Sequence, residues 1–359
     1  MFVRRIFGAP VLLAVLASAP AAQLSSPTFP DVPYYPGGSC EDPIACSTEE
    51  SERCLDVYLP VARRAGRATV LFVHGGGWGA GSKSAADCVA FCARLAELGH
   101  PVVACNYALA CPGEPGFPYA IRDVRAALAW VRGPGSRPPF SLGPDVVAVG
   151  FSAGAHLAGM VGVLGDAREP FFEPVGAYPV RDLAVEGVIA ISGPFDFYRF
   201  GRAGADSPPD ECPCSAIGFA PGYPPTIIGS LTVTFLGCQW RGACNTLPCA
   251  PESANPSDPC FEPNALTGNP FVDASPVHWV SPEDPPFFFL YSSCDSIVPG
   301  VESRWMRDAL AAVAVESDEL DLGRCGHAFT LFEDPEEAAE LVVPALRTFR
   351  RFALASPGR

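Results

Sequence analysis

Apolar and polar positions follow two periods along most of the chain, one typical of strands and one of helices. The pattern predicts strands at 54–59, 69–74, 101–107, 146–151, 188–192, 287–291 and 317–322. Helical spacing predicts helices at 84–98, 120–131, from 152 onward, 301–313 and 335–351. Strands that alternate with helices of this length require right-handed crossovers, so the pattern predicts an α/β fold with a mostly parallel sheet covered on both faces.

The alternation stops over one long segment, residues 196–284, which we call the insertion. It holds 14 of the 40 prolines and six of the 15 cysteines of the chain. This composition disfavours a helical lid and favours irregular loops joined by disulfides. Long segments without regular structure inside a domain are usually functional. We therefore expect the insertion to form a cap beside the functional site and to influence substrate choice.

The N-terminus has the pattern of an export signal. Arg4 and Arg5 precede a short apolar run and then the small residues at 19–22. This predicts a signal peptide over residues 1–22 and a secreted or periplasmic protein. The apolar run is too short to span a bilayer, and no later run is long enough either.

The segment after the signal peptide is rich in proline, serine and acidic residues. We expect residues 23–53, which we call the arm, to lie on the surface of the main domain. The catalytic domain is then expected to cover residues 54–353, with the insertion inside it.

Net charge and cysteine content limit the partners and the compartment. A net charge of −15 disfavours nucleic acids and anionic membranes, because both repel an acidic protein. Fifteen cysteines favour disulfides in an exported protein, and the odd number leaves at least one unpaired. Zinc is the alternative for Cys212, Cys214 and the cysteines at 238–260, but His278 is the only histidine near them. We predict disulfides and no metal site.

The strongest chemical signal is Gly150-Phe151-Ser152-Ala153-Gly154, between an apolar strand and a helix. A strand that turns this sharply into a helix needs small residues two positions before and two after the serine, as Gly150 and Gly154 are. The turn lifts the serine hydroxyl to the helix N-terminus, where negative charge is favoured. A Gly-X-Ser-X-Gly also occurs by chance, but this context predicts that Ser152 is a nucleophile.

A second motif, His74-Gly75-Gly76-Gly77-Trp78, ends an earlier strand. An enzyme that transfers acyl groups needs N–H donors for an oxyanion, and glycines leave such donors accessible. We predict that Gly76 and Gly77, with the N–H of Ala153, form an oxyanion hole. His74 is expected to anchor the loop rather than to transfer protons.

The general base and its acid partner are expected after the nucleophile, in the order Asp or Glu, then His. His327 is the only histidine beyond the penultimate strand, and it lies in a glycine-rich loop. Asp295 follows the strand at 287–291 and is the predicted acid. A turn-forming role for Asp295 is the simpler alternative, and Asp196 is the rival acid. His156 is expected to be a packed residue of the nucleophile helix.

These motifs resemble the hormone-sensitive-lipase type of α/β-hydrolase esterase. Within that type the chain is most similar to the bacterial feruloyl-esterase-like and prenylcysteine-methylesterase-like branch, over roughly 54–195 and 270–350. The resemblance implies the α/β-hydrolase fold, a triad of Ser152, Asp295 and His327, and no cofactor. Further matching positions are Gly81, Ser82-Lys83, Asn106-Tyr107, Phe117-Pro118, Asp123, Trp130, Leu157, Ala274-Ser275-Pro276, Pro285-Pro286-Phe287, Val298-Pro299 and Gly326.

Two departures from this family pattern affect the interpretation. Ala108 stands where many relatives carry an arginine, so a local salt bridge is expected to be missing. Ala155 replaces a glycine, and the following His156 is shared with arylformamidases.

The predicted function is a secreted serine esterase for short-chain or carbohydrate-linked (acetyl or feruloyl) esters. An amidase similar to arylformamidases is one alternative. A non-catalytic binding protein with a hydrolase fold is another.

One disulfide follows from the proposed acid and base. If Asp295 and His327 share a hydrogen bond, their loops run side by side. Cys294 and Cys325 would then approach the Cα separation of about 5.5–6 Å that a bridge prefers. We therefore predict a Cys294–Cys325 disulfide.

Overall fold

The computed structural model of the chain describes nine segments. They are residues 26–40, 53–62, 66–110, 116–166, 169–197, 235–236, 266–267, 270–295 and 297–355. Every strand and helix expected from the sequence is present, with ends displaced by no more than a few positions. The α/β prediction is confirmed.

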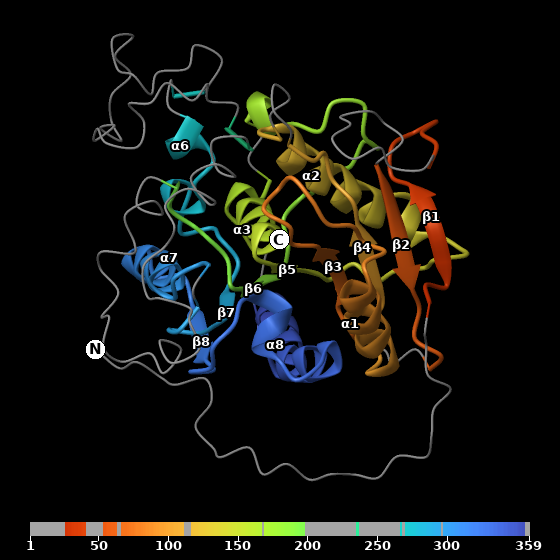
Figure 1. Cartoon of the computed structure of the whole chain (residues 1–359). Helices are drawn as coiled ribbons and strands as arrows, with labels where there is room; N and C mark the ends of the chain where they lie inside the picture. Colours follow the sequence, from red (N-terminus) through yellow and green to blue (C-terminus); the bar gives the residue numbers. More distant parts are fainter. Residues whose placement is uncertain are drawn as a thin grey trace.

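Eight strands form one sheet, in the order β1-β2-β4-β3-β5-β6-β7-β8 (Figure 1). β2 pairs antiparallel with β1 and with β4, and every other neighbouring pair is parallel. Loops that follow parallel strands gather at one edge of a sheet, so the segments after β3, β5, β7 and β8 meet there. The strands are β1 (Phe29–Pro33), β2 (Cys54–Tyr58), β3 (Thr69–Val73), β4 (Val102–Cys105), β5 (Val146–Phe151), β6 (Gly187–Ile191), β7 (Phe287–Tyr291) and β8 (Ser317–Asp321).

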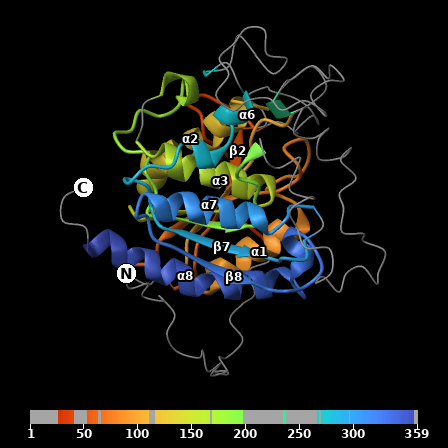
Figure 2. The ribbon, with the colours of Figure 1, turned by 90° about the vertical axis from the view of Figure 1, so that its left-hand side faces the viewer.

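Helices cover both faces of the sheet, as Figure 2 shows for its β7 and β8 end. α1 (Ala86–Glu97) and α8 (Pro335–Ala355) enclose one apolar core. α2 (Tyr119–Arg132), α3 (Ala153–Leu164) and α7 (Val301–Ala312) enclose the other. β2 to β7 are buried along their whole length because both faces are covered.

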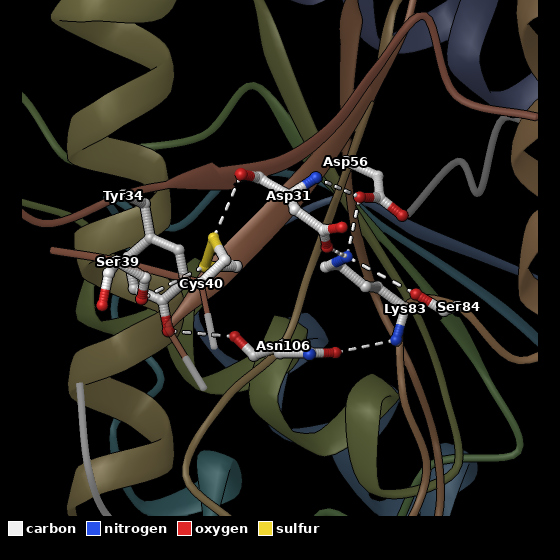
Figure 3. The surroundings of a disulfide bond; sticks show 9 residues. Asp31, Tyr34, Ser39, Cys40, Asp56, Lys83, Ser84 and Asn106 are labelled. Carbon is white, nitrogen blue, oxygen red and sulfur yellow. Dashed lines mark hydrogen bonds and ion pairs between the residues drawn. A yellow bond between two sulfur atoms is a disulfide. The ribbon is translucent and has the colours of Figure 1, made fainter. Parts of the chain in front are cut away.

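The arm contributes a strand that the sequence pattern did not predict. β1 extends the sheet beyond β2, and a disulfide joins Cys40 to Cys54, with the Cα atoms 5.9 Å apart. Lys83 is buried beside this bridge and contacts Asp31 at 2.6 Å and Asp56 at 2.7 Å (Figure 3). The described part of the arm is therefore an edge of the sheet, covalently joined to β2.

Most of the insertion lies outside the described residues, and so do the proposed signal peptide and the cysteines considered for zinc. Its described parts include Phe197, Phe235 and the one-turn helix α6 (Pro270–Asp273). Within the described segments, no helix is both long enough and apolar enough to cross a bilayer.

Candidate active site

Ser152 lies in the sharp turn between β5 and α3. Its φ is 54° and its ψ is −120°, a backbone conformation that residues other than glycine rarely adopt. The turn is held from both sides, since the Ser152 N–H donates to the carbonyl of Ile191 and the Ser152 carbonyl accepts from Ala155 and His156. The hydroxyl is thereby presented at the N-terminus of α3, as the sequence predicted.

The two glycines of the motif leave room for this turn. A Cβ on Gly150 would lie 2.2 Å from the carbonyl oxygen of Gly154, and a Cβ on Gly154 would lie 2.1 Å from that of Val73. Both obstacles are backbone atoms that cannot rotate away. The predicted need for small residues is confirmed.

The segment after β3 brings Gly75 beside Ser152. We call residues 74–81 the glycine loop. A Cβ on Gly75 would lie 3.3 Å from the Cβ of Ser152. Gly76 and Gly77 have φ values of 124° and 59°. Among the hydrogen bonds of the described residues, none uses the N–H of Gly76, Gly77 or Ala153, so these N–H groups are available to a ligand.

His74 anchors the start of this loop. Its Nδ1–H donates to the carbonyl of Gly75 at 2.7 Å, and its ring stacks on Tyr107. The Tyr107 hydroxyl donates in turn to the carbonyl of His74. Burial lowers the pKa of His74 to about 4, so the ring is neutral at pH 7. These contacts support the predicted anchoring role.

His327 joins the serine to an acid. Its Nε2 lies 2.7 Å from Ser152 Oγ, and its Nδ1 lies 2.8 Å from Asp295 Oδ2. The other oxygen of Asp295 accepts the N–H groups of Ile297 and Val298 at 2.8 and 3.0 Å. The structure therefore assembles the three residues that the sequence analysis selected, in a continuous relay.

Two hydroxyl residues that the sequence analysis missed hold the loop of His327. Thr330 Oγ1 accepts the N–H of His327 and donates to its carbonyl, both at 2.8 Å. Ser192, at the end of β6, accepts the N–H of Ala328 at 3.3 Å. Neither residue lies in a motif, so only the folded contacts identify them.

Asp196, the rival acid, is buried in the loop after β6 and is not the partner of His327 Nδ1. Glu302 on α7 accepts the backbone N–H groups of Phe195 and Asp196 at 2.8 and 2.9 Å. The geometry favours Asp295, because its carboxylate contacts His327 Nδ1 at 2.8 Å.

Two further histidines, His156 and His100, are buried in the scaffold, whereas His278 is exposed. His156 Nε2–H donates to the carbonyl of Ala274 at 2.7 Å, and His156 Nδ1 accepts the indole N–H of Trp78 at 3.1 Å. His100 Nδ1–H donates to the carbonyl of Ala68. Burial lowers the pKa of both rings to about 4. The expectation that His156 is a packed helix residue is confirmed.

The salt bridge expected to be missing at Ala108 has a substitute. Asp123 is buried, and Arg53, immediately before β2, lies 2.9 Å from its Oδ1. Asp123 also accepts the N–H of Ala108 and the hydroxyl of Tyr35. Arg53, the residue next to the disulfide, therefore supplies a cation to the carboxylate that binds the N–H of Ala108.

The predicted Cys294–Cys325 bridge is not present. Cys325 takes part in a disulfide, but Cys294 is a buried thiol. The two loops do run side by side, since Ser292 Oγ donates to the carbonyl of Arg324. Adjacent backbones do not determine the direction of each Cβ, and a bridge needs both Cβ vectors to converge.

Several known proteins are similar to this chain. Residues 55–219 match the BD-FAE family. "Probable carboxylic ester hydrolase LipM" of Mycobacterium tuberculosis is 29% identical over 281 residues, which cover 77% of this chain and 53% of that protein. "Esterase LipQ" of the same organism is 27% identical over 307 residues, 84% of this chain and 57% of that protein. The chain thus spans little more than half of the length of these curated relatives.

A solved structure shares the architecture. "Truncated form of carbohydrate esterase from gut microbiota" aligns with a TM-score of 0.61 at 18% identity, covering 93% of this chain and all of that chain. At this identity the likeness concerns the fold, and it supports the α/β-hydrolase assignment.

Proposed function

We propose that the chain is a serine-dependent carboxylic-ester hydrolase with an α/β-hydrolase fold, a proposal that its similarity to the BD-FAE family over residues 55–219 supports. The observation that carries the proposal is the relay from Asp295 through His327 to Ser152, whose two contacts measure 2.8 and 2.7 Å. Among the described residues, the N–H groups of Gly76, Gly77 and Ala153 have no hydrogen bond; Ala153 follows Ser152 directly, and Gly76 and Gly77 follow Gly75, which lies beside it. The curated relatives LipM and LipQ carry hydrolase and esterase names, which supports the same reaction class.

In the proposed reaction, Ser152 Oγ attacks the acyl carbon while His327 Nε2 takes the hydroxyl proton. Asp295 accepts the Nδ1–H, which selects the tautomer with a basic Nε2 and stabilises the imidazolium that forms. The proton then passes from Nε2 to the departing alkoxide, so an alcohol leaves and an acyl-serine remains. Water then attacks the acyl carbon while His327 Nε2 takes one of its protons. His327 returns this proton to Ser152 Oγ as the acyl–oxygen bond breaks and the acid leaves.

In each half-reaction the carbonyl oxygen of the ester becomes an oxyanion, which needs hydrogen-bond donors that are already in place. We assign this role to the N–H groups of Gly76, Gly77 and Ala153, the last at the N-terminus of α3. They need not break an internal bond first, because no hydrogen bond among the described residues uses them. Removing one such donor typically costs about 10²- to 10³-fold in kcat.

For the substrate we propose carbohydrate-linked acetyl or feruloyl esters, or other short-chain esters, met outside the cytoplasm. The match to the BD-FAE family and the fold shared with a carbohydrate esterase support this substrate class. The Cys40–Cys54 disulfide and the N-terminal signal pattern support an oxidising compartment. The amidase alternative rested on His156, but both ring nitrogens of His156 bind protein groups in the interior.

The test compares ester turnover by the wild-type protein and by Ser152→Ala on a panel of substrates. The panel contains short and long acyl p-nitrophenyl esters, acetylated xylan and feruloyl esters. We expect Ser152→Ala to lose about 10⁴-fold or more in turnover and to lose labelling by a fluorophosphonate probe. Ser136→Ala, a serine between α2 and β5, is the matched control and should keep both. Substantial turnover in Ser152→Ala would exclude the proposal, and a non-catalytic binding protein would show no turnover at all.

A further inference from the structure

Trp78 directly follows the oxyanion glycines, and its indole is tied to the nucleophile helix. Trp78 Nε1–H donates to Nδ1 of His156, 3.1 Å away on α3. His156 uses its other nitrogen as well, since Nε2–H donates to the carbonyl of Ala274 at 2.7 Å. One imidazole therefore links the glycine loop, α3 and the segment after α6.

This link lies in a dry aromatic cluster. Trp78 is 3% exposed and His156 is fully buried. The Trp78 ring stacks on Phe235 at 4.9 Å and meets Phe197 edge-on at 5.2 Å, and His156 contacts the same two rings. A hydrogen bond to a buried indole is costly to remove here, because water cannot replace it.

The glycine loop closes on itself in a turn that contains Trp78. The carbonyl of Gly76 accepts the N–H groups of Gly79 and Ala80 at 3.3 and 3.0 Å, so the Gly76–Gly77 peptide keeps its orientation within this turn. Gly76 and Gly77 hold positive φ angles, which glycine adopts without cost. The placement of their N–H groups relative to Ser152 therefore depends on what holds the turn as a unit. His74 restrains the loop before the glycines through the carbonyl of Gly75. After them, Trp78 provides the restraint through its side chain and through its carbonyl, which accepts the N–H of Ala110.

We infer that His156 is a positioning residue of the esterase site, which orients the N–H groups of Gly76 and Gly77 by holding the indole of Trp78. The inference rests on the proposed function and adds to it the residue that aligns the oxyanion donors. His156 acts through Trp78 and does not touch the reacting atoms. Its role requires a neutral ring whose Nδ1 accepts, and burial keeps the ring in that form by lowering its pKa to about 4.

The experiment removes each end of the Trp78–His156 bond and measures oxyanion stabilisation. The variants are Trp78→Phe, which deletes the indole N–H, His156→Leu, and the double variant. The matched control is His100→Leu, a buried histidine that also donates to a backbone carbonyl but lies between α1 and β4. The readouts are kcat and KM for p-nitrophenyl acetate, and the Ki of a trifluoromethyl ketone that forms an adduct with the serine.

We expect kcat to fall about 10- to 100-fold in each single variant, as for a small displacement of catalytic groups, with KM changed less than about twofold. The Ki of the ketone should rise in parallel with KM/kcat, because the adduct carries the oxyanion. The double variant should be no worse than the poorer single variant, since both remove one interaction. His100→Leu should keep wild-type kcat and Ki.

A merely structural role would lower the melting temperature and leave kcat and Ki unchanged, which would overturn the inference. If His156→Leu does not fold, Trp78→Phe decides alone, by the same two readouts. Two outcomes would exclude the proposed function and, with it, this inference: a wild-type protein without ester turnover, or an active Ser152→Ala variant. An active wild-type enzyme with an unaffected Trp78→Phe variant would remove only the role of His156.

Discussion

The Nε2 atom of His327 lies 2.7 Å from the Oγ atom of Ser152, although 175 positions separate the two residues in the chain. The contact arises because β5 and β8 are parallel strands of one sheet, and the loops that follow them emerge at the same edge. The loop after β7 lies between them in this order and carries Asp295.

The acid assignment is tested by comparing Asp295→Asn with Asp196→Asn. Asp295→Asn should lower kcat by about 10³- to 10⁴-fold, because an amide can donate to His327 Nδ1 and so favours the wrong tautomer. Asp196→Asn should lose far less, since the carboxylate that contacts His327 Nδ1 is that of Asp295. Steady-state kinetics on p-nitrophenyl acetate measure both, and the opposite ranking would assign the acid to the loop after β6.

The nucleophile turn predicts a sharp difference between two glycine substitutions. Gly154→Ala places a Cβ 2.1 Å from the carbonyl oxygen of Val73 and 2.5 Å from that of His74. We expect a loss of about 3 kcal/mol or more in the free energy of unfolding, or no folded protein. Gly143→Ala is the control, because its Cβ would have no neighbour closer than 3.7 Å.

Gly143→Ala should stay within about 0.5 kcal/mol of wild type. Urea denaturation followed by circular dichroism measures both proteins. A Gly154→Ala variant as stable as Gly143→Ala would contradict the described packing of α3 against the end of β3.

Arg53 should matter more at high pH than at low pH. Burial raises the pKa of Asp123 from 3.8 to about 6, while Arg53, Tyr35 and Ala108 oppose this rise. Because the pKa of Asp123 is higher in the folded state than in the unfolded state, its protonation stabilises the folded state. This contribution is complete below about pH 4 and is lost as the pH rises through 6. Arg53→Gln raises this pKa further. The variant should therefore lose about 1 to 2 kcal/mol more at pH 8 than at pH 5, relative to wild type.

The control for this pH effect is Arg94→Gln. Arg94 pairs with Glu97 and Glu340 at a partly exposed site, where such pairs contribute little. Its effect on the free energy of unfolding should be small and the same at both pH values. An equal effect of Arg53→Gln at pH 5 and pH 8 would mean that Asp123 is not charged beside it.

The Cys40–Cys54 disulfide should stabilise the edge of the sheet. The two cysteines are 14 positions apart, and the chain-entropy model assigns roughly 3 kcal/mol to a loop of this size. Cys40→Ala should lower the free energy of unfolding by about this amount. The Cys40→Ala/Cys54→Ala double variant should lose much less than the sum of the two single variants, because the first substitution already removes the bridge. Additive losses would show that the bridge contributes nothing.

The local sequence pattern was sufficient to predict the strands and helices and to select most of the candidate site residues. The apolar run at 69–74 and the glycines around Ser152 depend on neighbours within a few positions, and the sequence displays those neighbours directly. β1 was missed because Phe29–Pro33 contains two prolines and an aspartate, a composition that strands usually avoid. Only its pairing with β2 makes it a strand.

Contacts between segments that are distant in the chain could be identified only from the tertiary structure. Arg53 meets Asp123 beside Ala108 because β2 and β4 are neighbours in the sheet, which no local signal reports. The Cys294–Cys325 prediction was wrong for the same reason: the approach of two loops follows from sequence order, but the direction of each side chain does not.

The sequence by itself determined the α/β architecture, the strand-to-helix turn at Ser152, the glycines before Trp78 and the order of nucleophile, acid and base. Each of these depends on steric and periodic constraints within a short stretch of chain. Only the tertiary structure decided between Asp295 and Asp196, paired Arg53 with Asp123, and tied Trp78 to His156. These choices depend on which side chains meet across the sheet edge and in the core, and that is set by packing of the whole domain.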